Sequence, residues 1–153
     1  MRPHPLNASQ QTAVDALAAT GRITAVPVDL PRAEMFLRQA NEAIADLANL
    51  TRPQNQYSLA YDACHDVGEA LLAAYGYRTV NGPGQHATVG AFLRAVFDRP
   101  PGQQAARRFD KLRRSRNQQR YDAQPVGAAD AQIATQAAAD LLTAARAQGL
   151  EAR

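Results

Sequence analysis

The segment from Tyr57 to Tyr75 constrains the fold more than any other part of the chain. Its apolar and aromatic residues recur every three or four positions over about five helical turns. They form one continuous stripe: Tyr57, Ala60, Tyr61, Cys64, Val67, Leu71 and Tyr75. This spacing predicts a long helix that buries one face. Gly76 is suited to the left-handed conformation that ends a helix, and the following Asn81-Gly82-Pro83-Gly84 predicts a turn.

The same periodicity predicts helices on both sides of that segment. Pro31 is suited to the first turn of a helix that ends near Leu50, and we expect Pro53 to close that element. Further helices are predicted over residues 89–97, 103–121 and 128–148, separated by Pro100-Pro101 and by Pro125 with Gly127. In the last of them we expect four residues to face inward: Ile133, Ala137, Leu141 and Ala145.

These elements predict an all-α bundle of about five helices after an irregular N-terminal arm. Residues 1–30 make up the arm, with a short helix near Ser9–Ala19 and an extended stretch over residues 23–30. Residues 31–149 make up the helical domain. No stretch alternates polar and apolar residues for long enough to predict a sheet. The chain has 153 residues and no Trp, so its core is expected to be built from Ala, Leu and Val with a few rings.

Composition also narrows the compartment and the cofactor classes. The single cysteine, Cys64, excludes an internal disulfide, and its place on the apolar stripe predicts a buried, unreactive thiol. No His and Cys spacing is typical of a zinc site, and we expect neither a metal nor a cofactor. The first ten residues lack the apolar run of a signal peptide, and no stretch is long enough for a membrane span. We therefore expect a cytoplasmic protein with no membrane partner.

Positive charge is concentrated between Arg107 and Asp122. This segment has seven basic residues and two acidic ones, a net charge of +5, whereas the whole chain carries only +3. The rest of the chain is therefore slightly acidic. A localised basic element is typical of a protein that binds a polyanion such as a nucleic acid. A solvated helix face is the alternative explanation.

The order of residues within this segment favours binding. Phe109, Leu112 and Arg116 share one helical face, so Arg116 lies on the side that should pack against the bundle. A charge at such a position is costly unless it is paired or opens onto a wet cleft. Lys111, Arg113, Arg114 and Arg120 surround it and are candidate phosphate ligands.

A second row on this helix is entirely polar: Asp110, Arg114, Asn117 and Tyr121. Asn117 can hydrogen-bond a base edge, and Tyr121 can stack on a base. The same row is also compatible with an ordinary surface, because Asp110 and Arg114 have the spacing of a helical ion pair.

Residues from about Ala33 to Ala145 resemble a HEPN domain, a family of small helical bundles named for nucleotide binding in higher eukaryotes and prokaryotes. Its motif is an Arg, often followed by Asn, with a His four to six residues after the Arg. Arg116-Asn117 matches the beginning of the motif, and Tyr121 stands where the His is expected. The run from Tyr61 to Tyr77, followed by Gly84-Gln85-His86, is similar to an actinobacterial-type branch of the family.

The resemblance implies a homodimer that places two motifs in one cleft and binds RNA or a nucleotide. Many members are metal-independent endoribonucleases of toxin–antitoxin pairs. By this resemblance Arg116, Asn117 and Tyr121 are the candidate catalytic residues, with Arg116 at the phosphate and Tyr121 orienting the ribose 2′-OH. A Tyr is a weak base at neutral pH, since its ordinary pKa is about 10, so the motif favours binding over cleavage. An ideal helix separates Arg116 and Tyr121 by about 140°, so one site can use both only if the helix ends or loosens near Arg120 or if the two subunits each supply one.

Three other hypotheses remain open from the sequence. His86 follows the glycine-rich turn, where it can cap a helix or reach the proposed nucleic-acid site. Asp62, His65, Asp66 and Glu69 form a polar row that has metal-ligand chemistry, although a solvated face is the simpler explanation. The basic helix can also dock an acidic protein, an antitoxin or a nucleotidyltransferase, in a non-catalytic regulatory role.

Overall fold

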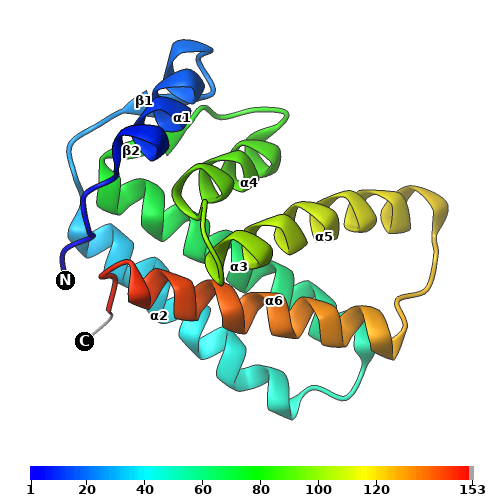
Figure 1. Cartoon of the computed structure of the whole chain (residues 1–153). Helices are drawn as coiled ribbons and strands as arrows, with labels where there is room; N and C mark the ends of the chain where they lie inside the picture. Colours follow the sequence, from blue (N-terminus) through cyan, green and yellow to red (C-terminus); the bar gives the residue numbers. More distant parts are fainter. Residues whose placement is uncertain (152–153) are drawn as a thin grey trace.

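The computed structural model describes residues 1–151, apart from the side chain of Tyr121. Their backbone is mainly helical, as the sequence predicts (Figure 1). The elements in chain order are α1 (Ala8–Ala19), β1 (Ile23–Ala25), α2 (Leu30–Asp46), a 3-10 turn (Leu47–Asn49), α3 (Pro53–Tyr75), β2 (Tyr77–Thr79), α4 (Gln85–Val96), α5 (Gly102–Asp122) and α6 (Ala128–Ala147). The all-α prediction and the five helices after the arm are confirmed.

Helix α3 is the centre of the bundle. Its predicted stripe is buried from Tyr57 to Leu71, and α2, α4 and α6 pack around it. Gly76 ends the helix in the left-handed conformation, with φ of 80°. The expectation that Pro53 closes the preceding helix is wrong, because Pro53 is the first residue of α3. Its missing N–H removes no hydrogen bond there, since the first N–H groups of a helix have no partner within it.

Helix α6 covers the side of α3 opposite α4 and buries mostly alanines. Ala137, Leu141 and Ala145 face inward as predicted, but Ile133 is 53% exposed. Steps of four residues turn through 400°, so a row spaced by four drifts by about 40° at each step. Ile133 lies at the end of such a row and has moved off the buried stripe. That is why the inward prediction for Ile133 is wrong.

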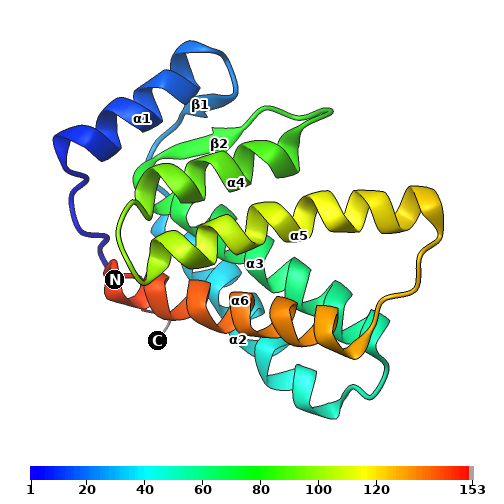
Figure 2. The same ribbon diagram turned by 45° about the vertical axis from the view of Figure 1, so that its right-hand side comes forward.

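The N-terminal residues pack onto the bundle. Val14 of α1 and Ile23 of β1 are buried, and α1 contacts α4 (Figure 2). Strand β1 pairs antiparallel with β2, with Ile23 opposite Thr79 and Ala25 opposite Tyr77. The sequence predicted no sheet, because two strands of three residues are too short to show a period of two. This pairing fixes the segment that leads into the 82–84 turn.

Helix α5 has two different halves. The buried residues of α5 lie between Gly102 and Leu112. After Leu112, none of the described side chains of this helix is buried. The second half runs beside the start of α4 and then into a long connection to α6 (Figure 1). Most of the arginines of the basic segment therefore lie on the second half of α5, which extends beyond the core.

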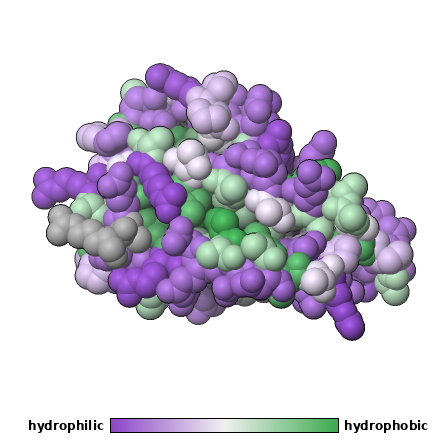
Figure 3. Space-filling view, turned by 90° about the horizontal axis from the view of Figure 1, so that it is seen from below, coloured by the Kyte–Doolittle hydropathy of each residue, from purple (hydrophilic) through white to green (hydrophobic). Residues whose placement is uncertain are grey.

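The α2–α6 side differs chemically from α5. Seen from below, this face carries a band of apolar side chains bordered by hydrophilic ones (Figure 3). Within residues 1–151, no helix is both long enough and apolar enough to cross a membrane.

Candidate nucleic-acid interface

A cleft of about 470 Å³ lies between the start of α4 and the second half of α5. We call it the α4–α5 cleft; residues 82–87, Tyr61, Arg113, Arg116, Asn117 and Arg120 line it. No carboxylate occurs among the described residues of this lining. Gly84 precedes α4 in the left-handed conformation, and no side chain caps that end of the helix. The free N–H groups of the first turn therefore add partial positive charge to three guanidinium groups.

Arg116 lies on the aromatic ring of Tyr61. Its guanidinium carbon is 4.4 Å from the ring centroid, a cation–π contact, and the side chain is half-buried. Tyr61 itself is 1% exposed and also packs on Phe109. The sequence placed Arg116 on the apolar side of its helix, and the ring accommodates it there. No acidic side chain within residues 1–151 forms an ion pair with it.

His86 joins this arrangement from the start of α4. The Tyr61 hydroxyl and His86 Nδ1 are 3.0 Å apart, within hydrogen-bond distance. The ring centroids of His86 and His65 lie 4.5 Å apart, so α3 and α4 bring two imidazoles together, and His86 lines the cleft. His86 is exposed and faces the ligand space, whereas His65 is half-buried behind it.

Both imidazoles are held in the neutral form. Burial, the nearby His86 and Arg116 lower the pKa of His65 to about 4. Burial and then Arg116 also lower the pKa of His86, while Asp62 acts in the opposite direction. Burial raises the pKa of Tyr61, although Arg116 opposes the shift. At neutral pH a neutral phenol and two neutral imidazoles therefore lie close to the guanidinium groups of the cleft.

Asp110 organises the arginines next to the cleft. Its carboxylate is buried and pairs with Arg94 of α4 at 3.0 Å and with Arg113 at 3.2 Å. It also accepts a hydrogen bond from Arg114, which confirms the predicted Asp110–Arg114 pair. Burial would raise the pKa of Asp110, but the hydrogen bonds from Arg114 and Arg113 lower it overall. Three cations share one anion, so the cluster keeps a net positive charge.

The structure divides the predicted phosphate ligands between two surfaces. Arg113, Arg116, Asn117, Arg120 and His86 meet in the α4–α5 cleft. Lys111 and Arg114 instead line a separate groove on the other side of α5, with Arg94, Arg107 and Arg108.

Tyr121 is within the backbone of α5, but its side chain lies outside what the structure describes. The helix continues to Asp122, so it does not end near Arg120. Of the two ways to combine Arg116 and Tyr121 in one site, the early helix end is therefore wrong. The contribution of two subunits stays a prediction.

No family model matches the chain, and no curated protein or solved structure is similar to it at a significant level. The resemblance to HEPN domains thus rests on the sequence motif alone.

The polar row on α3, from Asp62 to Glu69, is neither the metal site nor the fully solvated face that the sequence suggested. His65 and Asp66 are half-buried and Glu69 is buried, so the solvated face that we favoured is wrong for these three residues. Within the described part of the chain, no three His, Cys, Asp or Glu side chains are grouped to hold a metal ion. Cys64 is buried as predicted, and burial raises the pKa of its thiol.

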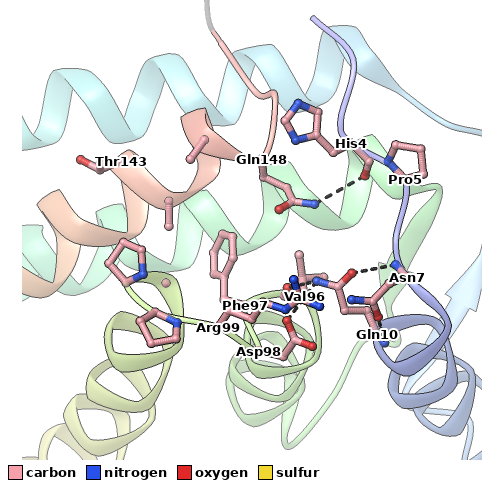
Figure 4. Close-up of a pocket in the computed structure, with 15 residues that line it drawn as sticks. His4, Pro5, Asn7, Gln10, Val96, Phe97, Asp98, Arg99, Thr143 and Gln148 are labelled. Carbon is pink, nitrogen blue, oxygen red and sulfur yellow. Dashed lines mark hydrogen bonds between the residues drawn. The ribbon is translucent and has the colours of Figure 1, made fainter.

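A second cavity, of about 350 Å³, lies where the N-terminal residues meet α6 (Figure 4). Gln10 donates hydrogen bonds to the Val96 carbonyl and to Asp98, and Gln148 contacts the His4 carbonyl. Its polar groups are mostly engaged with each other, and Arg99 is the one arginine among its described lining residues. This cavity lacks the converging cations of the α4–α5 cleft.

Sequence reasoning missed the contribution of α3 to the cleft. Tyr61 was assigned to the core, which is where its ring lies, but its hydroxyl reaches His86. The signal available was the presence of tyrosine on the buried stripe, because a buried phenol needs a hydrogen-bond partner. For His65 the sequence offered a metal ligand or a solvated position, and neither places its imidazole beside His86.

Proposed function

We propose that this protein binds RNA or a nucleotide through phosphate groups held in the α4–α5 cleft. One observation carries the proposal: Arg113, Arg116 and Arg120 converge with the uncapped start of α4 in a cleft whose described lining has no carboxylate. Guanidinium groups and helix N-termini both bind phosphate oxygens. A surface that served solubility alone would mix charges of both signs.

The residues have distinct parts in this proposal. Arg116 holds a phosphate, and its stacking on Tyr61 orients the guanidinium before the ligand arrives. Arg113 is oriented by Asp110, and Arg120 is the exposed outer contact. Asn117 is placed to hydrogen-bond a base edge beside the phosphate.

Binding is tested by fluorescence anisotropy with a labelled oligoadenylate. Arg116→Ala should raise Kd at least about tenfold, because a hydrogen bond to a charged group contributes about 1.5–3 kcal/mol. Arg38→Ala is the matched control, since Arg38 is an exposed arginine on α2 that pairs with Glu34. It should change Kd less than twofold. If the wild-type protein binds neither RNA nor nucleotides at low salt, the proposal is wrong.

We extend the proposal to metal-independent RNA cleavage with His86 as the general base. In the tautomer whose Nδ1–H donates to the Tyr61 hydroxyl oxygen, Nε2 is free to accept the proton of a ribose 2′-OH. The 2′-oxygen then attacks phosphorus, the bond from phosphorus to the 5′-oxygen breaks, and water supplies a proton to that oxygen. The products are a 2′,3′-cyclic phosphate and a 5′-hydroxyl. Arg116 stabilises the charge that develops on the phosphate.

Cleavage is tested with His86→Gln and Arg116→Ala on a labelled RNA. His86→Gln should abolish cleavage while binding persists, whereas Arg116→Ala should reduce both. Because the pKa of His86 is lowered, the midpoint of the loss of activity on acidification should lie below that of an ordinary histidine. Equal cleavage by wild type and His86→Gln would leave RNA binding in place and remove the catalytic role of His86.

A further inference from the structure

A second basic groove lies on the other side of α5 from the cleft. We call it the outer groove; it has a volume of about 600 Å³, and Arg94, Arg107, Arg108, Lys111 and Arg114 supply its positive charge. Asp110 is the acid in its described lining, and its carboxylate is already shared among three arginines. Arg108 pairs with Asp140 at 3.1 Å, whereas Arg107 and Lys111 form no ion pair within residues 1–151.

The outer groove and the α4–α5 cleft meet at Asp110. One carboxylate oxygen binds Arg113, which lines the cleft, and the other binds Arg114, which lines the groove. Asn117 lies one turn beyond Arg113 on the exposed surface between them. Positive charge is therefore continuous across the outer face of α5, and no free carboxylate among the described residues interrupts it.

The dimensions of this surface indicate the size of the ligand. Arg107 and Arg120 are thirteen residues apart on α5, which corresponds to about 20 Å along the helix axis. At about 3.4 Å per stacked nucleotide, this distance spans roughly six nucleotides of one strand. The cleft alone has the volume of a small-molecule site, which admits one or two nucleotides.

We propose that the ligand is a single RNA strand that enters the α4–α5 cleft and continues across α5 into the outer groove. This inference rests on the proposed function and specifies its substrate class: a strand of about six nucleotides or more, in place of a mononucleotide. Arg107 and Lys111 bind the phosphates of the extension. We expect a cleft of about 470 Å³ to exclude a double helix, which would then contact the outer groove alone.

The experiment compares labelled oligoadenylates of 3 and 12 nucleotides by anisotropy. The test protein is Arg107→Gln/Lys111→Gln, and both residues are exposed. The control, Arg38→Gln/Arg146→Gln, removes the same charge from α2 and α6. Wild type should bind the 12-mer at least tenfold more tightly than the test protein does, while both bind the 3-mer equally. A 12-mer offers more overlapping binding positions than a 3-mer. This statistical factor is the same for wild type, test protein and control, so it cancels when their affinities for the 12-mer are compared.

Salt dependence gives an independent measurement. Loss of two phosphate contacts should reduce the slope of log K against log salt by about 1.4 for the 12-mer, at about 0.7 per contact on a single strand. The slope for the 3-mer should not change. Equal 12-mer affinity and slope in wild type and test protein overturn the inference, while 3-mer binding would still support the cleft.

Two further outcomes also overturn it. A 12-base-pair duplex that binds as tightly as the single strand shows that the surface does not select one strand. Poly-glutamate that displaces the 12-mer equally well per charge shows that the groove fits an acidic protein segment. If wild type binds neither oligonucleotide, this inference fails, and if it also binds no nucleotide, the proposed function fails with it.

Discussion

At the scale of single residues, the Tyr61 ring determines the orientation of the Arg116 guanidinium. The guanidinium stacks on the ring face, and the hydroxyl on the same ring reaches His86. One buried side chain from α3 thus links the basic helix to the start of α4. The ring and the hydroxyl have separable effects.

We expect Tyr61→Phe and Tyr61→Leu to differ in RNA binding. Tyr61→Phe keeps the ring under Arg116, so Kd should change less than twofold, and the free energy of unfolding should fall by about 1 kcal/mol for the lost hydrogen bond. Tyr61→Leu removes the ring and should weaken binding several-fold. Anisotropy and urea unfolding measure the two quantities. Equal affinities in the two variants would show that stacking does not orient Arg116.

His65 should make the protein less stable in mild acid. Its pKa is about 4 in the folded chain and 6.5 in the unfolded chain, so between these values the unfolded chain binds more protons. The contribution of His65 to the free energy of unfolding must then fall as pH decreases from 6.5 to 4, by at most about 3 kcal/mol. Asp66 acts oppositely, because its pKa is raised to about 6 and the folded chain holds its proton longer.

The contribution of His65 is isolated by comparing wild type with His65→Gln. Asp66 affects both proteins, so it cancels in the difference between their urea unfolding energies at pH 7.5 and pH 5. The variant should lose less stability than wild type on acidification. Identical losses would show that folding does not lower the pKa of His65.

How much of the site could be predicted depends on which helix each residue occupies. Arg113, Arg116, Asn117 and Arg120 lie on one predicted helix, so their common region followed from its period. His86 and Tyr61 reach the cleft only through the packing of α4 and α3 against α5, and no local pattern encodes that packing. The motif therefore directed attention to Tyr121, although an imidazole from another helix lies in the cleft.

At the scale of elements, Asp110 connects α4 to α5. Asp110→Asn should lower the free energy of unfolding by about 1–3 kcal/mol, because three arginines lose their buried counterion. The same change makes the basic surface more positive, so RNA affinity should stay equal or increase. Urea unfolding and anisotropy on one preparation test both expectations. A parallel loss of stability and affinity would mean that Asp110 mainly shapes the cleft.

Gly68 sets the approach of α3 to α4. A Cβ added there would collide with the Val89 side chain, and Val89 is fully buried. Gly68→Ala should cost about 1–3 kcal/mol by overpacking. In the double variant with Val89→Ala the costs should be less than additive, because the second change vacates the space. A urea-based double-mutant cycle measures the coupling, and strict additivity would contradict direct contact.

The positions of the helices were predictable because the apolar spacing continues over several turns in each helix, and because proline and glycine residues separate the helices. The error at Pro53 arose because a proline can end one helix or begin the next, and its sequence does not distinguish the two. The error at Ile133 arose because a row spaced by four residues drifts across a helix of this length. Both errors concern the ends of elements, where tertiary packing decides.

At the scale of the whole molecule, charge is distributed unevenly over a small bundle. The cleft and the outer groove gather most of the basic side chains of α5, together with Arg94 of α4, while the α2–α6 face carries an apolar band (Figure 3). The N-terminal residues, through β1 and β2, fix the segment before the turn that lines the cleft. Ligand binding should therefore leave the fold unchanged and alter mainly its electrostatic energy.

The α4–α5 cleft thus carries like charges without a counterion among its described residues, and the ligand-free fold bears their mutual repulsion. A bound polyanion removes that repulsion and stabilises the folded chain in proportion to the logarithm of its concentration over Kd. The melting temperature should rise with short oligonucleotides at low salt, and less so in Arg116→Gln/Arg120→Gln. The rise in melting temperature would then rank candidate ligands, because each of them stabilises the folded chain by supplying the negative charge that the cleft lacks.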